Sequence, residues 1–234
     1  MGDDAGVSGE QGQSELDALA ALAEAEGDEI VEKALGIARE MLGMELAYMT
    51  QFTDADQVYR AVDGAGEEFS MDEGGAYPLE GSYCRRMVLG QIPNAVPDTS
   101  AEDELRDLEL TSKADIGSYV GVPITLSDGT LYGTVCVTSH DANPELAERD
   151  VAFMRVLARI IAGQLEQRRL ARENEALKGR VASLKLEIDQ AAQQEQVAEI
   201  SDSEWFGDLS QRAGTLRKIA GGHAGAGAEG GEGR

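Results

Sequence analysis

The residues that could do chemistry in this chain are few. Its 234 residues include two cysteines, Cys84 and Cys136, and two histidines, His140 and His223. A catalytic triad needs a histidine beside a serine or cysteine nucleophile, and His223 lies in a Gly-rich tail. His140 is therefore the sole candidate base, and a single histidine at the end of a predicted strand is typical of a surface or capping residue. The sequence predicts no catalytic triad.

Metal and phosphate sites are equally weakly indicated. Cys136 and His140 are four residues apart and Cys84 could approach them, but no CxxC or HxxxH spacing is present. Haem would have only His140 as an axial ligand in the folded part. Gly225, Gly227 and Gly230 spell GxGxxG without a strand before them or a helix after them. We expect no structural zinc and no nucleotide-phosphate site, and the identity of any cofactor stays unknown.

The two cysteines leave two alternatives open. Both fit as buried, small apolar residues, which is the commoner role of a free cysteine. Arg85 and Arg86 follow Cys84 directly, and a neighbouring cation lowers a thiol pKa and makes it more reactive. A redox-reactive Cys84 is the second alternative.

The net charge and the lack of long apolar runs limit which partners are expected. Lys and Arg total 20 against 44 Asp and Glu, a formal charge of −24, which disfavours nucleic acid and anionic membranes as partners. No apolar run approaches the ~20 residues that span a bilayer, and the acidic N-terminus does not look like a signal peptide. We expect a cytoplasmic protein.

The element best placed to position such residues is a predicted hairpin followed by a helix. Residues 127–129 read Ser-Asp-Gly, a turn signal, and apolar residues alternate with others on both sides, as in strands with two different faces. Asn143, with Pro144 after it, is a suitable N-cap for the helix.

The remaining elements follow from local patterns. We expect helices from Ser14 to about Gly43, strands at 46–52 and 57–62, and a loop at 63–80. A short helix at 82–89 and an extended piece at 94–98 come next, and Thr99 with Glu102 predicts a capping box for a helix to about Leu110.

A heptad pattern runs from the hairpin's helix to about Ile200. A helix of this length, on the order of 80 Å, cannot bury its apolar stripe in so small a domain, so the pattern favours a homodimeric coiled coil. Asn174 falls at position a, where Asn favours a parallel two-stranded register. The predicted dimerisation residues are Ile160, Leu170, Asn174, Leu177, Val181, Leu184 and Ile188.

The chain thus divides into five predicted segments. Residues 1–13 and 221–234 are predicted to be disordered, 14–168 to form the domain and 169–200 the coiled coil. Residues 201–220, with Trp205, predict a short helix or a segment that docks on a protein partner.

The order of elements resembles that of a GAF domain over about residues 14–168. The stretches IGSYVGVPI, LYGTVCVTS and LAERDVAFMRVLARIIAGQLE resemble the final strands and exit helix of bacterial GAF sensor domains, and GSYCRRMVLGQIPNAVPDTS resembles their middle. The resemblance implies an α+β fold similar to PAS domains, with an antiparallel sheet, flanking helices and a small-molecule pocket on one face. The pocket residues it implies are Cys84, Tyr119, Tyr132, Thr134, Cys136 and Thr138, unless these side chains simply fill a collapsed pocket.

The sequence lacks several motifs of GAF domains with known ligands, which limits the classes of ligand expected here. The Cys-His of bilin-binding members is missing from residues 100–110, as is the Asn-Lys…Phe…Asp-Glu pattern of cyclic-nucleotide-binding members. The free methionine sulfoxide reductases of this fold need more cysteines, differently arranged.

We therefore expect a non-catalytic, dimeric GAF sensor that binds a small molecule or partner and signals along its exit helix. The alternatives are a GAF-fold thiol oxidoreductase that uses Cys84 and a coiled-coil scaffold with an empty pocket.

Overall fold

The computed structural model describes residues 29–201 and 203–222, together with Asp17, Ala18, Ala20, Leu22, Ala25 and Gly27. The chain separates into two compact units, Met1–Leu170 and Ala171–Arg234, which are described one by one. The segments predicted to be disordered, 1–13 and most of 221–234, lie outside the described residues, as does much of the helix predicted from Ser14.

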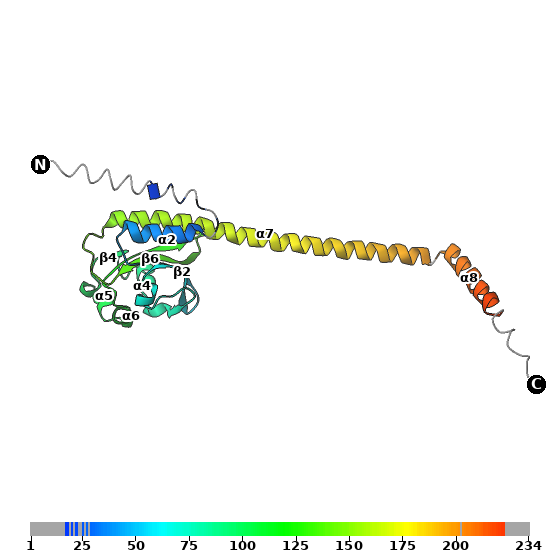
Figure 1. Cartoon of the computed structure of the whole chain (residues 1–234), viewed down its shortest axis with the longest axis horizontal. Coiled ribbons are helices and arrows are strands. Elements are labelled where there is room, and N and C mark those ends of the chain that lie inside the picture. Colours follow the sequence, from blue (N-terminus) through cyan, green and yellow to red (C-terminus); the bar gives the residue numbers. More distant parts are fainter. Residues whose placement is uncertain are drawn as a thin grey trace, which may run out of the picture. The chain divides into compact units, whose positions relative to one another are not determined.

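A six-stranded antiparallel sheet forms the centre of the first unit, with the order β3-β2-β1-β6-β5-β4 (Figure 1). Its strands are β1 (Leu46–Phe52), β2 (Asp56–Gly64), β3 (Ala76–Pro78), β4 (Ala95–Val96), β5 (Ser118–Thr125) and β6 (Leu131–Ser139). The predicted α+β fold, with an antiparallel sheet and flanking helices, is confirmed.

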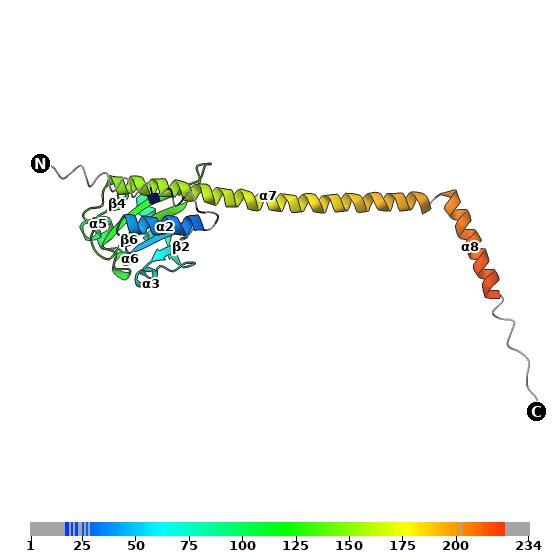
Figure 2. The same cartoon turned by 45° about the horizontal axis from the view of Figure 1, so that its top comes forward.

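Two helices cover one face of this sheet. They are α2 (Glu29–Met41) and the start of α7 (Glu148–Ser201), which lie side by side in both views (Figures 1 and 2). Val120, Val122 and Val137 on the strands pack with Leu35 of α2 and Leu157 of α7 in one buried apolar cluster. This face holds the larger of the two buried clusters, and alternate residues of β5 and β6 point towards it.

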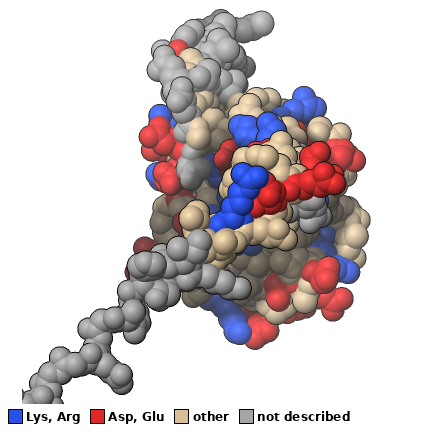
Figure 3. All heavy atoms as spheres, turned by 90° about the vertical axis from the view of Figure 1, so that its right-hand side faces the viewer, with Lys and Arg blue, Asp and Glu red and all other residues tan. Residues whose placement is uncertain are grey.

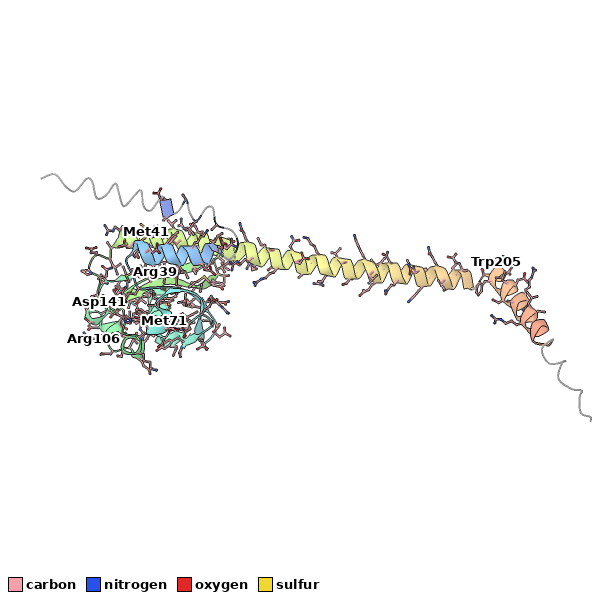
Figure 4. The ribbon with its side chains drawn as sticks, in the orientation of Figure 1. Arg39, Met41, Met71, Arg106, Asp141 and Trp205 are labelled. Atoms are coloured by element: carbon pink, nitrogen blue, oxygen red, sulfur yellow. The ribbon has the colours of Figure 1, made fainter. Side chains whose placement is uncertain are left out.

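Short helices and loops cover the opposite face, which we call the interior face. They are α3 (Gly66–Phe69), η1 (Leu79–Gly81), α4 (Tyr83–Val88), η2 (Thr99–Ala101), α5 (Asp103–Arg106) and α6 (Glu109–Lys113). Met71 belongs to the buried cluster of this face, on the side of the sheet away from Arg39 and Met41 of α2 (Figure 4).

The predicted hairpin is present. The Leu126 amide donates to the Thr130 carbonyl at 2.9 Å, and the Thr130 amide donates to the Asp128 carboxylate at 2.9 Å. Gly129 has φ of +83°, a conformation that glycine adopts without steric cost. The turn signal in the sequence therefore identified both strands.

Three local predictions need correction. The loop at 63–80 contains α3 and the edge strand β3, which pairs with β2. Thr99 does not cap a helix to Leu110: its hydroxyl donates to the Ile116 carbonyl, and the segment is broken into η2, α5 and α6. The Asn143 side chain accepts from the Glu145 amide at 3.1 Å in a turn, and α7 begins only at Glu148. In each case a tertiary contact or a competing turn replaced the local signal.

The long helix predicted from the heptads is present as α7, 54 residues from Glu148 to Ser201. In the second unit, α8 spans Glu204–Gly222, over the segment predicted to be a short helix or a docking segment. Trp205 lies at the start of α8 (Figure 4). Among the described helices, none is both long and apolar enough to cross a membrane.

Candidate functional site

Four of the predicted pocket residues meet on the interior face. Cys84 on α4 places its Sγ 3.7 Å from Sγ of Cys136 on β6. The Tyr119 hydroxyl on β5 lies 3.2 Å from Cys136 Sγ, which also donates to Oγ1 of Thr134 at 3.3 Å. We call Cys84, Tyr119, Thr134 and Cys136 the thiol cluster. All four are buried, with at most 1% of each exposed.

The local sequence explains how each member is held. Ser82 caps α4 by accepting from the Arg85 amide at 3.1 Å, which fixes the first turn where Cys84 lies. Gly121 pairs with Cys136 across the β5–β6 ladder. A Cβ at Gly121 would stand 2.0 Å from the Tyr119 hydroxyl oxygen and 2.5 Å from the ring carbon that carries it. The missing side chain of Gly121 is therefore what lets Tyr119 lie over β5 and reach Cys136.

The two other predicted pocket residues are not part of the thiol cluster. Thr138 is on the same face of β6 by alternation, but its hydroxyl donates to the Ser118 carbonyl at 2.8 Å and so takes part in strand pairing. Tyr132 packs against the helix-side core instead. The register of β5 and β6 shifts between Ile124 and Thr125, so that Ile124 pairs with Gly133 and Thr125 with Leu131. This bulge interrupts the alternation at Tyr132, and placing Tyr132 on the interior face was therefore wrong.

Large side chains that sequence reasoning did not assign fill the space around the thiol cluster. Tyr48 and Tyr59 make an edge-to-face contact with ring centroids 5.6 Å apart, and Tyr83 does the same with Tyr119 at 5.3 Å. Phe69 and Met71 are buried in the same cluster. The alternation in β1, where Tyr48 stands between Ala47 and Met49, carried the signal for Tyr48. A ligand on this face would have to displace some of these side chains.

The electrostatics of the two thiols differ. Burial alone would raise the pKa of Cys84, but hydrogen bonds from Cys136, Thr134, Tyr119 and Tyr48 together lower it. Burial and the neighbouring Cys84 raise the pKa of Cys136 well above its ordinary value. The pKa shifts of the two neighbouring thiols therefore run in opposite directions.

The cause of this shift differs from the one the sequence indicated. The Arg85 side chain lies near Glu80 at 4.0 Å, and the Arg86 side chain donates to the Glu80 carbonyl at 2.8 Å. Neither is among the groups that lower the Cys84 pKa most, which are all buried in the interior face. The groups that lower the Cys84 pKa are therefore buried neighbours brought together by the fold, not the adjacent arginines that the sequence pointed to.

One cleft of the first unit lies on the helix side of the sheet. A cleft of about 340 Å³ is lined by Val31 and Leu35 of α2, Arg60 and Asp63 of β2, and Arg168 of α7, with Glu32, Met49, Ala61, Val62 and Glu73. Asp63 pairs with Arg39 of α2 at 2.5 Å. The lining of this cleft carries charges of both signs. Figure 3 likewise shows Lys and Arg side chains among Asp and Glu on the face that it presents.

His140, the sole histidine of the predicted domain, packs against an aromatic ring and contacts a backbone carbonyl. The His140 ring stacks on Phe69 with centroids 3.9 Å apart, and its Nδ1 lies 2.8 Å from the Asp115 carbonyl oxygen. Within the described residues, no group of three or more His, Cys, Asp or Glu side chains is arranged to hold a metal ion.

The predicted dimerisation residues divide into two groups. Ile160 packs partly against the helix-side core of its own domain. Asn174 is exposed, and the apolar residues after Ile160 are each more than half exposed in the single chain, namely Leu170, Leu177, Val181, Leu184 and Ile188.

Comparisons with known proteins agree with this fold. A family model described as "GAF domain" matches residues 24–166, more than half of the chain. The cyclic di-GMP phosphodiesterase PA2567 of Pseudomonas aeruginosa is 27% identical over 154 residues, which are 65% of this chain and 25% of that protein. The chain thus spans about a quarter of the length of this curated relative.

Solved structures extend the likeness at low identity. The GAF domain of a phosphoenolpyruvate-protein phosphotransferase from Coxiella burnetii superposes with a TM-score of 0.56 at 15% identity, covering 69% of this chain and 95% of that one. The chromophore-binding domain of the R. palustris bacteriophytochrome RpBphP3 gives 0.56 at 14%, covering 73% and 64%. The free methionine-R-sulfoxide reductase from Neisseria meningitidis, in complex with its substrate, gives 0.54 at 16%, covering 73% and 95%. At these identities the likeness concerns the fold.

Proposed function

Because the chain belongs to the GAF domain family, we propose that it is a non-catalytic sensor or regulatory protein that works as a homodimer. One observation carries the proposal. The helix α7 begins among the buried residues of the domain, with Val151, Met154 and Leu157, and then continues as one helix with an exposed heptad stripe. The helix α7 thus contributes both to the domain core and to an exposed stripe suited to a second copy.

The binding half of the proposal places the ligand on the interior face. The thiol cluster offers hydroxyl and thiol groups in an otherwise apolar and aromatic surrounding, the kind of lining that small-molecule sites have. Tyr48, Tyr59 and Tyr83 occupy part of this face, so a ligand would enter by moving the short helices that cover it. Ligand binding would therefore change where α4 packs on the sheet.

The signalling half rests on the exposed stripe of α7. Burying large apolar side chains between two copies stabilises a dimer by about 1.5–3 kcal/mol for each fully buried side chain. A ligand that alters the packing of the domain core would bias the register or spacing of the paired helices, because packed helices have discrete arrangements. The second unit, with Trp205 and Leu209 of α8 exposed, would then present or withhold a surface to a protein partner. We place this activity in the cytoplasm. The charge of −24 argues against nucleic acid or an anionic membrane as a direct partner.

Native mass spectrometry of the full chain purified from its own host tests the proposal. We expect a dimer that carries a small molecule, released on unfolding and identified by its mass. A dimer that binds nothing would favour the scaffold alternative, in which side chains fill the interior face permanently. A monomer at micromolar concentration would contradict the dimeric mechanism.

Coupling is tested by the distance between the two copies of α7. With spin labels at Gln193, the distance distribution should shift when the identified ligand is added. An unchanged distribution at saturating ligand would rule out signalling through the exit helices, even if the ligand binds.

A second candidate function is favoured by the thiol cluster itself. A GAF-fold thiol oxidoreductase would use Cys84 as the nucleophile, and a methionine sulfoxide reductase of known structure shares the fold. Multiple-turnover reduction of free methionine sulfoxide, abolished in a Cys84→Ser variant, would establish this alternative. Absence of turnover with a dithiol reductant present would leave the sensor proposal in place.

A further inference from the structure

The two cysteines of the described chain come from distant positions and meet inside the domain. Cys84 and Cys136 are 52 residues apart in sequence, both are free thiols, and their sulfur atoms lie 3.7 Å apart. We infer that this pair is a redox modification site, in which a peroxide converts Cys84 and Cys136 to an intramolecular disulfide that ties α4 to β6. The inference does not depend on the identity or the existence of a small-molecule ligand.

The geometry requires only a small movement. A disulfide bond is about 2.0 Å long, so the sulfurs must approach by roughly 1.7 Å from their present contact. Cys84 lies on α4, a helix of only six residues, whereas Cys136 lies on β6 between two paired strands. The approach is therefore expected to come from α4 and the Cys84 side chain, since β6 is held on both sides.

The two thiols have different roles. The hydrogen bonds described above favour the thiolate of Cys84, and the thiolate is the form that attacks peroxides. The Cys136 sulfur is held by Tyr119 at 3.2 Å and Thr134 at 3.3 Å. Tyr119 and Thr134 act as positioning residues that hold the second sulfur next to the first.

The chemistry balances with a peroxide as the oxidant. The Cys84 thiolate attacks one oxygen of hydrogen peroxide, the O–O bond breaks, and the leaving hydroxide takes a proton to become water. Cys84 is then a sulfenic acid. The Cys136 sulfur attacks Cys84 Sγ, the S–O bond breaks, and the leaving hydroxide takes the Cys136 proton as a second water. In total, two thiols and one hydrogen peroxide give one disulfide and two waters.

The burial of the two thiols controls which oxidants reach them and how fast the disulfide forms. With at most 1% of either cysteine exposed, a bulky reagent cannot reach the thiols in the closed domain, whereas hydrogen peroxide is close to water in size. The rate is therefore expected to follow local opening of the short helices over the interior face. Once formed, the disulfide closes a loop of 52 residues and restrains that opening, which would change access to the interior face.

The test uses the full chain and graded hydrogen peroxide. After quenching with catalase, the protein is unfolded with N-ethylmaleimide present, and its intact mass and non-reducing peptide map are measured. We expect both thiols to disappear together, a monomer mass lower by two hydrogen atoms, and a peptide pair joined through Cys84 and Cys136 that dithiothreitol separates. Thiols that persist unmodified, oxygen adducts that accumulate on one cysteine, or disulfides between chains would each overturn the inference.

Two variants test the order of the steps. In Cys136→Ser, Cys84 should stop at the sulfenic acid and be labelled by dimedone present while the protein is unfolded, whereas in Cys84→Ser, Cys136 should stay unoxidised. The opposite labelling would overturn the assigned roles. In the native chain, oxidation should also raise Tm by roughly 10 °C, as a disulfide across a loop of this size predicts, and neither variant should show this rise. An unchanged Tm with the crosslink present would overturn the claim that the disulfide restrains the domain.

Discussion

At the scale of single residues, the interior face depends on one glycine. Gly121 has no side chain where Tyr119 crosses β5, and the hydroxyl of Tyr119 reaches the Cys136 sulfur because of it. Tyr119 is fully buried, so it cannot swing away without disturbing its contact with Tyr83. The thiol cluster therefore depends on the missing Cβ of Gly121 as well as on its own polar groups.

Gly121→Ala is expected to destabilise the protein by about 1–3 kcal/mol, because the new methyl overlaps the Tyr119 ring in a closed core. Urea unfolding followed by circular dichroism measures the loss. Gly163→Ala is the matched control: it lies in α7 with nothing within 4 Å of the added methyl, and alanine favours a helix by about 0.5–1 kcal/mol. Equal effects of the two substitutions would contradict the role of Gly121.

Ser82 is the second residue on which the cluster depends. Its hydroxyl oxygen accepts from the Arg85 amide at the start of α4. Ser82→Ala should cost about 1 kcal/mol of stability and loosen the first turn, where Cys84 lies. The measurable result is faster alkylation of Cys84 in the folded protein. Ser183→Ala, at an exposed position within α7, should leave the rate of alkylation unchanged.

At the scale of elements, the β5–β6 turn ties a titratable group to the stability of the hairpin. The Asp128 carboxylate accepts from Thr130, and these hydrogen bonds lower the pKa of Asp128. A lowered pKa means that the stabilisation is fully present above the unfolded value of about 3.9 and is lost as the pH falls through the folded value.

Asp128→Asn should therefore reduce the loss of stability that the protein shows as the pH falls. Thermal unfolding measured from neutral pH down to about pH 3 should show a smaller loss for the variant than for the native chain below the unfolded pKa of Asp. Parallel curves for the two proteins over that range would show that Asp128 does not contribute to the acid sensitivity.

The exit helix offers a sharper test, because it has two leucines that differ only in heptad position. Leu184 falls at position d of the predicted frame and Leu186 at position f, and they are 55% and 59% exposed in the single chain. Leu184→Glu should weaken the dimer by at least about 100-fold in Kd, since it puts a charge into the predicted seam of both copies. Leu186→Glu should leave Kd unchanged. Analytical ultracentrifugation distinguishes them, and equal effects would exclude the coiled coil in this frame.

At the scale of the whole molecule, the two units are expected to divide stability and assembly between them. The first unit, Met1–Leu170, has both buried clusters and all six strands. A chain shortened after Leu170 should therefore unfold cooperatively, with a Tm within a few degrees of the full chain at the same low concentration. It should also sediment mainly as a monomer. A shortened chain that stays fully dimeric would move the principal dimer contact from α7 into the domain itself.

The sequence determined much of this protein because its strongest signals are local. Asp128 and Gly129 define a turn whatever surrounds them, and alternation on either side placed Tyr119, Thr134 and Cys136 on one face of the sheet. The apolar repeat of α7 likewise predicted a helix that ends near Ile200, and the ordered elements identified the fold.

Only the tertiary structure decided the rest, since it depends on contacts between residues far apart in the chain. No local pattern places Cys84 3.7 Å from Cys136. Nor does any local pattern show that the buried Cys136 thiol and nearby hydroxyls, rather than the adjacent arginines, lower the Cys84 pKa. The bulge that turns Tyr132 to the helix side depends on how β5 pairs with β6, and the broken helices after Thr99 depend on its bond to Ile116. Alternation and capping are properties of one segment, whereas a shared cluster requires the packed sheet.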